Sequence, residues 1–122
     1  MNSLVKRASR IPGRVLRKIR SLQYKDLLAR NTVHIQLKIH KLPFWINVQD
    51  QVLGRHFYIY RDYENFETGL IERLLSHDMT VIDIGANIGF HSVICGRRVS
   101  NGRVIAFEPD PNNFDLLRKT SS

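Results

Sequence analysis

The chain has 122 residues, a formal net charge of +8 and 43% hydrophobic residues, which suits one small folded domain. Eleven of the 19 basic residues, but only one of the 11 acidic residues, lie within residues 1–41, so the basic character belongs to the first third. A single cysteine excludes an internal disulfide, and no apolar run approaches the roughly 18 residues of a membrane span or forms a secretory signal after the basic start. These features predict a cytoplasmic protein.

Residues 1–30 are expected to form a basic helical segment. Within residues 4–22, apolar side chains recur at helical spacing among basic ones, interrupted at Pro12-Gly13. The stripe consists of Leu4, Ala8, Ile11, Val15, Ile19 and Leu22. Three interpretations remain open: a helix that is solvated or packs on a partner, peripheral attachment to anionic lipid, and nucleic-acid contact. Nucleic acid is not expected, because neither interleaved aromatic residues nor a binding motif accompanies the charge.

Residues 31–62 are expected to form a small β element. Apolar and polar residues alternate from Val33 to Ile39, which predicts a strand with one solvated face carrying His34 and His40. Residues 44–48 and, after Gly54, residues 56–60 predict two further short strands. No third ligand joins the two histidines at a suitable spacing, so no metal site is predicted.

Residues 63–122 begin with a predicted helix over residues 64–77, followed by a βαβ pattern. The helix has one apolar side (Phe66, Leu70, Ile71, Leu74 and Leu75). Residues 80–109 then read as strand, glycine turn, helix, Asn-Gly turn and strand, typical of a parallel βαβ unit. After Pro109, the sequence Asp110-Pro111 predicts the start of another helix.

Both strands of this unit end in an acid, at the sheet edge where α/β proteins bind ligands. Asp83 ends the first strand, and Glu108, 19 residues after Gly89, stands where a dinucleotide fold places its ribose-binding acid. A nicotinamide motif would need glycine at position 87, where the chain has Asn87. The pattern D-x-G-x-N-x-G with its strand-end acid favours a ligand with a cationic or amine-bearing end, such as S-adenosylmethionine (SAM).

The segments VIDIGANIGFHSV and GRVIAFEPDPNNFDLL resemble the FkbM family of class I SAM-dependent methyltransferases, and the resemblance covers roughly residues 48–118. It implies a Rossmann-like α/β fold of which this chain holds the first βαβ unit. It also implies O-methylation of a sugar or natural-product hydroxyl, with a small-molecule or glycan acceptor. The cofactor-binding residues that it implies are Asp83, Gly85, Ala86, Asn87, Gly89 and Glu108.

The catalytic residues stay unassigned. His91, Glu64 and Glu67 are near the expected pocket in sequence, but each is more often a surface residue, and Cys95 is expected to be a buried apolar residue. Only two strands of the family's sheet are present, so we expect a truncated enzyme that is inactive alone. The alternative is a non-catalytic nucleotide-binding or assembly module that docks to a membrane or a partner through its basic segment.

Overall fold

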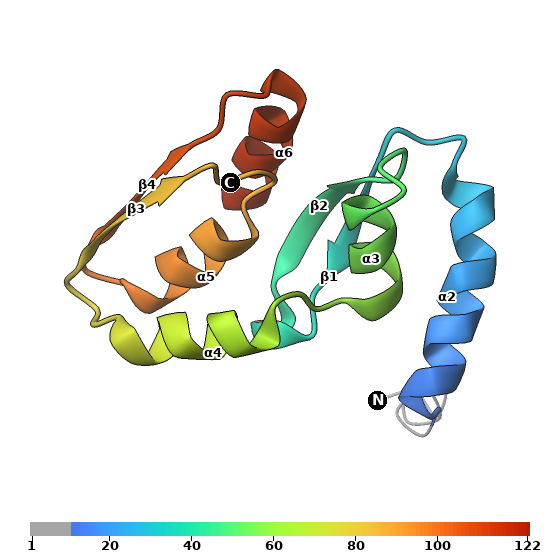
Figure 1. Cartoon of the computed structure of the whole chain (residues 1–122), viewed down its shortest axis with the longest axis horizontal. Helices are drawn as coiled ribbons and strands as arrows, with labels where there is room; N and C mark the ends of the chain where they lie inside the picture. Colours follow the sequence, from blue (N-terminus) through green and yellow to red (C-terminus); the bar gives the residue numbers. More distant parts are fainter. Residues whose placement is uncertain (1–10) are drawn as a thin grey trace.

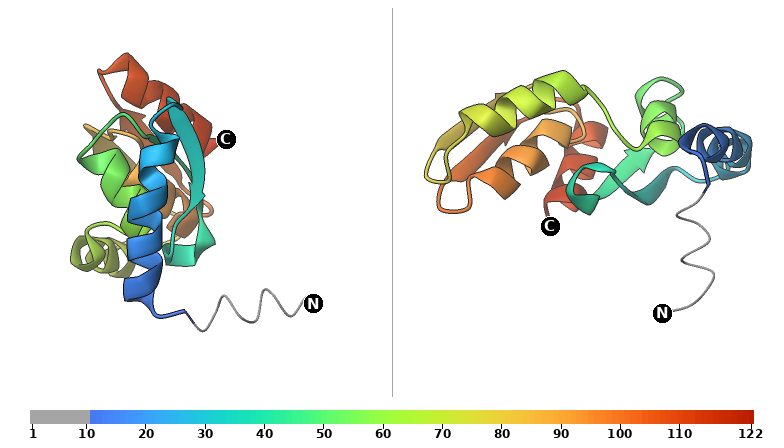
Figure 2. Two further views of the ribbon diagram at one scale, coloured as in Figure 1. Left: turned by 90° about the vertical axis from the view of Figure 1, so that its right-hand side faces the viewer. Right: turned by 90° about the horizontal axis from the view of Figure 1, so that it is seen from below.

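The computed structural model describes residues 11–122, which form helices and two small sheets (Figure 1). The elements, in chain order, are α2 (Gly13–Leu27), β1 (Thr32–Gln36), η1 (Ile39–Lys41), β2 (Pro43–Asn47), α3 (Leu53–Tyr60), α4 (Asn65–Leu74), β3 (Thr80–Ile84), α5 (Phe90–Arg98), β4 (Arg103–Phe107) and α6 (Pro111–Ser121). Figure 2 shows α2 and the β3–β4 unit at opposite ends of the molecule, with the β1–β2 pair and α3 between them. The chain is therefore mixed α/β.

The basic helix α2 begins at Gly13, directly after Pro12, and packs on α3 through a face different from the predicted apolar stripe. Its one buried residue is Tyr24, whose hydroxyl donates to the Val48 carbonyl at 2.5 Å. Arg20 donates to the Ile59 carbonyl at 3.1 Å from the same side. The stripe residues Val15, Ile19 and Leu22 are 44%, 40% and 65% exposed, and Leu4 and Ala8 lie outside the described residues. The described residues of the stripe are thus on a side of α2 that is not packed on α3.

The two strands β1 and β2 pair antiparallel, from Thr32 opposite Asn47 to Gln36 opposite Pro43. β1 ends at Gln36, so the prediction that His34 and His40 share one strand face is wrong. His40 lies in η1 at a positive φ of 48° and pairs with the Glu72 carboxylate, whereas His34 packs edge-on against Trp45 with ring centroids 5.3 Å apart. Within residues 11–122, no group of three histidine, cysteine or acidic residues could hold a metal ion.

The third predicted strand, residues 56–60, is wrong: these residues belong to the helix α3. One Asp50 carboxylate oxygen accepts the backbone N–H groups of Val52 and Leu53, both at 2.9 Å, and so caps the start of that helix. Gly54 is not a turn residue but a packing contact, because a Cβ there would stand 1.9 Å from the Asn47 carbonyl oxygen. Local β propensity was overridden by this cap and by burial of Phe57 in the core.

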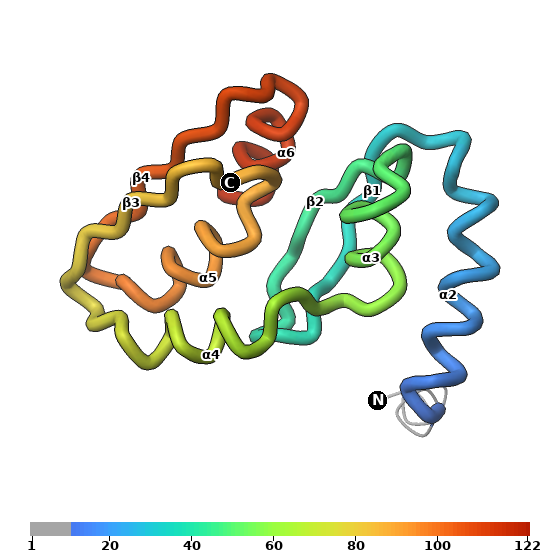
Figure 3. Tube along the Cα trace, in the orientation of Figure 1, coloured from blue at the N-terminus to red at the C-terminus, as the bar shows by residue number. Residues whose placement is uncertain are grey.

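The predicted βαβ unit is confirmed. β3 and β4 pair in parallel, from Thr80 opposite Arg103 to Ile84 opposite Phe107, with α5 between them in sequence. Helix α4 ends at Leu74, shorter than predicted, and α6 starts as predicted, with Asp110 accepting the N–H groups of Asn112 and Asn113. The trace in Figure 3 shows α5 lying along one side of β3–β4. This arrangement brings the loops after both strands to one edge of the sheet.

A buried cluster joins the β1–β2 hairpin and α3 to the glycine loop, α5 and α6. It contains Tyr24, Ile35, Leu37, Phe44, Ile46, Val48, Phe57, Ile88, Phe90, Ile94 and Leu116. These residues come from all three predicted segments (1–30, 31–62 and 63–122), and α6 packs against β2, where Thr120 accepts the Trp45 backbone N–H at 3.1 Å. The hairpin and α3 therefore form a wall beside the glycine loop, against which a pocket can form.

One face of the β3–β4 sheet is apolar and exposed. Ile82, Ile84, Ile105 and Phe107 are 60%, 83%, 40% and 56% exposed, whereas the alternating positions turn toward α5. Between residues 11 and 122, no helix is both long and apolar enough to cross a membrane.

Candidate functional site

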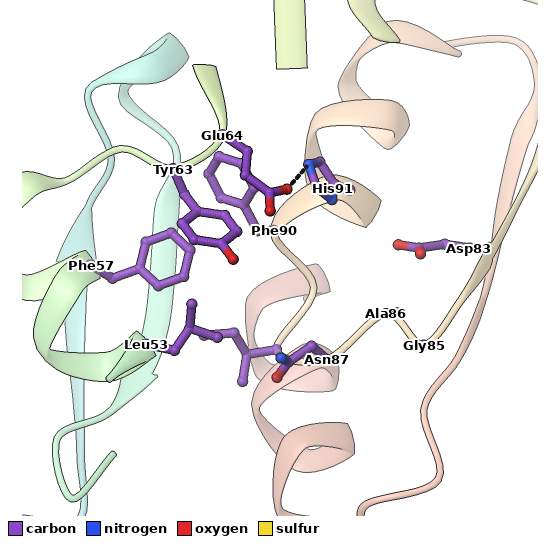
Figure 4. A pocket seen from close by; sticks show the side chains of 11 residues that line it. Leu53, Phe57, Tyr63, Glu64, Asp83, Gly85, Ala86, Asn87, Phe90 and His91 are labelled. Atoms are coloured by element: carbon purple, nitrogen blue, oxygen red, sulfur yellow. Dashed lines mark ion pairs between the residues drawn. The ribbon is translucent and has the colours of Figure 1, made fainter. Parts of the chain in front are cut away.

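A cavity of about 210 Å³ lies between the loop that follows β3, the first turn of α5 and the wall formed by α3 and the start of α4 (Figure 4). Its lining residues are Leu53, Phe57, Tyr63, Glu64, Asp83, Gly85, Ala86, Asn87, Ile88, Phe90 and His91. Whole-ligand pockets commonly measure about 300–1,000 Å³, so this cavity suits one end of a larger ligand. Four of the six predicted cofactor-binding residues line it.

The loop Gly85–Gly89 turns through three residues with left-handed backbone angles: Gly85 (φ 78°), Asn87 (φ 52°) and Gly89 (φ 91°). The N–H groups of Gly85 and Ala86 both donate to the Phe107 carbonyl, at 2.9 and 3.0 Å. The Gly89 N–H donates to the Ala86 carbonyl at 2.9 Å. These three backbone N–H groups therefore already have acceptors within the protein.

The two glycines serve different purposes. At Gly85 a Cβ would have no heavy atom of the protein within 4 Å, so the space beside this residue is open. At Gly89 a Cβ would lie 2.5 Å from Leu117 Cδ1, because α6 packs closely against the start of α5. Gly85 therefore leaves open space beside the cavity, whereas Gly89 permits close helix packing and does not line the cavity.

Glu108 lies on the other side of the loop and is oriented by the backbone. Its Oε2 accepts the Asn87 N–H at 2.7 Å, and its Oε1 accepts the Asp110 N–H at 2.9 Å. A carboxylate offers about four acceptor sites, so two remain for hydroxyl donors. The parallel pairing of β3 with β4 places Glu108 beside the loop that follows Asp83, as the sequence predicted.

Asp83 faces α5, since alternate residues of a strand point to opposite faces. Its Oδ2 accepts the Ser92 hydroxyl at 2.5 Å, which fixes the side chain while the carboxylate still borders the cavity. Cys95, buried on the same helix, is not part of the cavity lining. Its burial, with the nearby Asp83 charge, raises the pKa of the thiol. This agrees with an apolar role for that cysteine.

Three aromatic rings line one side of the cavity and form an aromatic wall: Phe57 of α3, Tyr63 before α4, and Phe90 at the start of α5. Tyr63 packs on Phe57 and Phe90 with ring centroids 5.2 and 5.7 Å apart, and Figure 4 shows these rings beside the cavity. Burial, followed by the charge of Glu64, raises the pKa of the Tyr63 phenol, so this group stays protonated and can donate a hydrogen bond at neutral pH. The wall makes one side of the cavity apolar.

Glu64 and His91 complete the site, although their sequence positions favoured surface roles. The His91 Nε2 lies 3.3 Å from the Glu64 Oε2, and both side chains border the cavity (Figure 4). Their alignment does not make a hydrogen bond, so this buried Nε2 has no hydrogen-bond partner in the described structure. Glu67 does not line the cavity. The only sequence signal for Glu64 was its position in the stretch that resembled the methyltransferase family, before the glycine loop.

The site combines an aromatic wall with two carboxylates, Asp83 and Glu64, and one ionisable imidazole. Such a cavity favours a cationic group, because each carboxylate keeps acceptor capacity that a cation can satisfy. No heavy atom of the protein lies within 4 Å of a Cβ built at Gly85, so a ligand group can approach the backbone there. The residues present therefore fit SAM, which carries a sulfonium, an α-ammonium and a ribose.

Comparison with known proteins gives one informative match. A stretch of 44 residues is 43% identical to hexuronic acid methyltransferase AglP of Haloferax volcanii, and the match covers 36% of this chain and 17% of that protein. No family model and no solved structure matches the chain. The similarity supports a methyltransferase in general, and the chain spans less than a fifth of the relative that it matches.

Proposed function

We propose that the cavity and the adjacent Glu108 bind SAM, and that the chain supplies the cofactor side of a methyltransferase of the FkbM type. One observation carries the proposal: the parallel β3–β4 pairing sets Asp83 and Glu108 on either side of a glycine loop whose Asn87 N–H is fixed by Glu108. Bound SAM would supply an electrophilic methyl group carried on a sulfonium. The free acceptor sites of Glu108 would hold the ribose hydroxyls, and the acidic cavity would hold the cationic methionine end.

The methyl acceptor is proposed to be a sugar. The relative with the 44-residue match is named as a hexuronic acid methyltransferase, and a sugar of that class offers hydroxyl and carboxylate oxygens as nucleophiles. The residues here contribute positioning and exclusion of water by the aromatic wall of Phe57, Tyr63 and Phe90. The exposed apolar face of β3–β4 supports the further proposal that this chain works as part of a larger methyltransferase.

Calorimetric titration of the chain with S-adenosylhomocysteine, the product form of the cofactor, tests this proposal. Wild type should bind, and Glu108→Gln should weaken binding by about 10- to 100-fold, as expected for loss of charge-assisted hydrogen bonds worth roughly 1.5–3 kcal/mol. Asp115→Asn is the matched control, because this exposed acid on α6 pairs with Arg118 away from the cavity. No binding by the folded wild-type chain would refute the proposal.

A second proposal concerns the basic helix α2, which we infer contacts anionic membranes peripherally. Val15, Ile19 and Leu22 form an exposed apolar stripe, and helical periodicity places the exposed Arg14, Lys18 and Lys25 along one flank of it, away from the face packed on α3. This contact is compatible with the methyltransferase proposal and would equally serve a non-catalytic assembly module.

Vesicle co-sedimentation tests the membrane proposal. The chain should sediment with phosphatidylserine vesicles and remain in solution with phosphatidylcholine vesicles. Ile19→Ser should reduce sedimentation, whereas Val52→Ser, an 81% exposed apolar residue outside α2, should not. Equal sedimentation of the two variants would contradict a role for the stripe.

A further inference from the structure

Glu64 carries the inference, and its backbone is the first unusual feature. It precedes α4 with φ 43° and ψ 54°, a left-handed conformation that is uncommon for a residue other than glycine, asparagine or aspartate. Its side chain makes no capping hydrogen bond to α4, although its position at the helix N-terminus would allow one. Strained backbone of this kind is concentrated where function requires it.

The side chain that this conformation presents borders the cavity. Figure 4 shows the Glu64 carboxylate beside His91 and above the Tyr63 ring, across the cavity from Asn87. The imidazole is a poor partner, since its buried Nε2 is 3.3 Å away and not aligned for a hydrogen bond. The carboxylate is thus held at the cavity with acceptor capacity unused within the described protein.

The position of Glu64 indicates which part of a ligand it would meet. Glu108, the acid expected to hold the ribose, lies outside the cavity lining on the far side of the loop, whereas Glu64 lines the cavity itself. A ligand anchored by its ribose at Glu108 and passing Gly85 would place its amino-acid end among Asp83, Glu64 and the aromatic wall. Asp83 already accepts the Ser92 hydroxyl, whereas Glu64 lies beside the Tyr63 phenol and the poorly aligned His91 imidazole, so an ammonium group could take a further acceptor site of Glu64.

We propose that Glu64 is a further cofactor-binding residue, which accepts a charge-assisted hydrogen bond from the α-ammonium group of the methionine end of SAM. This inference rests on the proposed function. It assigns this contact to a residue before α4 rather than to the glycine loop. It also accounts for the poor alignment of the Glu64–His91 pair, because the ammonium group would replace the imidazole as the partner of the carboxylate.

Two ligands that differ only in the amino-acid end test the inference. S-adenosylhomocysteine carries the α-ammonium, and 5′-methylthioadenosine keeps the adenosine and the thioether but lacks the amino acid. Calorimetric titration of the whole chain should show that Glu64→Gln weakens binding of S-adenosylhomocysteine at least about 10-fold and changes binding of 5′-methylthioadenosine less than about two-fold. Glu67→Gln, in the first turn of α4 but outside the cavity lining, should leave both affinities unchanged.

The outcomes separate this inference from the proposed function. If the folded wild type binds neither ligand, both fail. If wild type binds both ligands and Glu64→Gln leaves the affinity for S-adenosylhomocysteine unchanged, or weakens both ligands equally, the ammonium contact is wrong while the cofactor site stands. His91→Gln tests whether Glu64 acts only through its pair with His91. The same selective loss of affinity for S-adenosylhomocysteine in this variant would show that the Glu64–His91 pair, and not a direct contact from Glu64, determines that affinity.

Discussion

Alanine substitutions at Gly85 and Gly89 should give different stability losses, although both residues have positive φ. A Cβ in the left-handed region costs about 1–2 kcal/mol, and at Gly85 that strain is the whole cost, because the added methyl meets no protein atom within 4 Å. At Gly89 the methyl would also lie 2.5 Å from Leu117 Cδ1. Overpacking adds about 1–3 kcal/mol, so Gly89→Ala should cost about 2–5 kcal/mol.

Urea unfolding followed by circular dichroism measures these differences. Gly69→Ala is the matched control, since Gly69 lies within α4 with no atom near its missing Cβ, and alanine there should stabilise the helix by up to about 1 kcal/mol. In thermal unfolding each kcal/mol corresponds to roughly 3–5 °C for a chain of this size. A loss at Gly89 equal to or smaller than that at Gly85 would refute the packing argument. Gly85→Ala should also weaken cofactor binding, because its methyl would enter the open space.

Three further predictions concern the core and buried ionisable groups. Phe57→Ala should lower the free energy of unfolding by about 3–5 kcal/mol, because this ring is fully buried. Phe66→Ala, at a 78% exposed ring, should change it by no more than about 0.5 kcal/mol. Equal losses in urea unfolding would contradict the assigned core. Cys95 should react slowly with Ellman's reagent in the folded chain and rapidly in urea, because burial raises the pKa of its thiol and limits access of the reagent. Rapid stoichiometric reaction of the folded chain would show that the thiol is not buried. Burial, with the charge of Asp50, raises the pKa of the Tyr24 phenol in the folded chain above its ordinary value of 10.0. The resulting contribution to the free energy of unfolding is present below pH 10 and is lost as the pH rises through the folded-state pKa. The free energy of unfolding of wild type should therefore fall above about pH 10 more steeply than that of Tyr24→Phe, and parallel pH profiles would contradict the shift.

The βαβ unit with its glycine loop was the most predictable part of the chain, because its signals are local. Alternating apolar runs that end in Asp83 and Glu108, with glycines between them, indicated strand, turn, helix and strand, and the parallel pairing is as expected. The start of α6 was also readable, since the Asp110 cap and Pro111 act within a few residues. The acceptors of the Gly85, Ala86 and Asn87 N–H groups could not be predicted, because Phe107 ends the neighbouring strand β4 and Glu108 follows it directly.

Two wrong or incomplete predictions have the same physical origin. The run His56–Tyr60 has the composition of a strand, yet it is helical because an Asp50 cap and close contact with Asn47 stabilise α3. In α2, Tyr24 and Arg20 determine which face packs on α3. Their side chains donate hydrogen bonds to the Val48 and Ile59 carbonyls, which are distant in sequence. Hydrophobic periodicity reports neither kind of contact, since both depend on residues far away in sequence.

The sequence by itself determined the βαβ unit, the strand-end acids, the concentration of basic charge in the first third and the resemblance to a methyltransferase family. Only the tertiary structure decided that Glu64 and His91 border the same cavity as Asp83, and that Gly89 packs closely against Leu117 outside the cavity lining. The reason is that propensity, capping and periodicity act over a few residues. A binding cavity, in contrast, is assembled from elements whose separation in the chain carries no information about their distance in space.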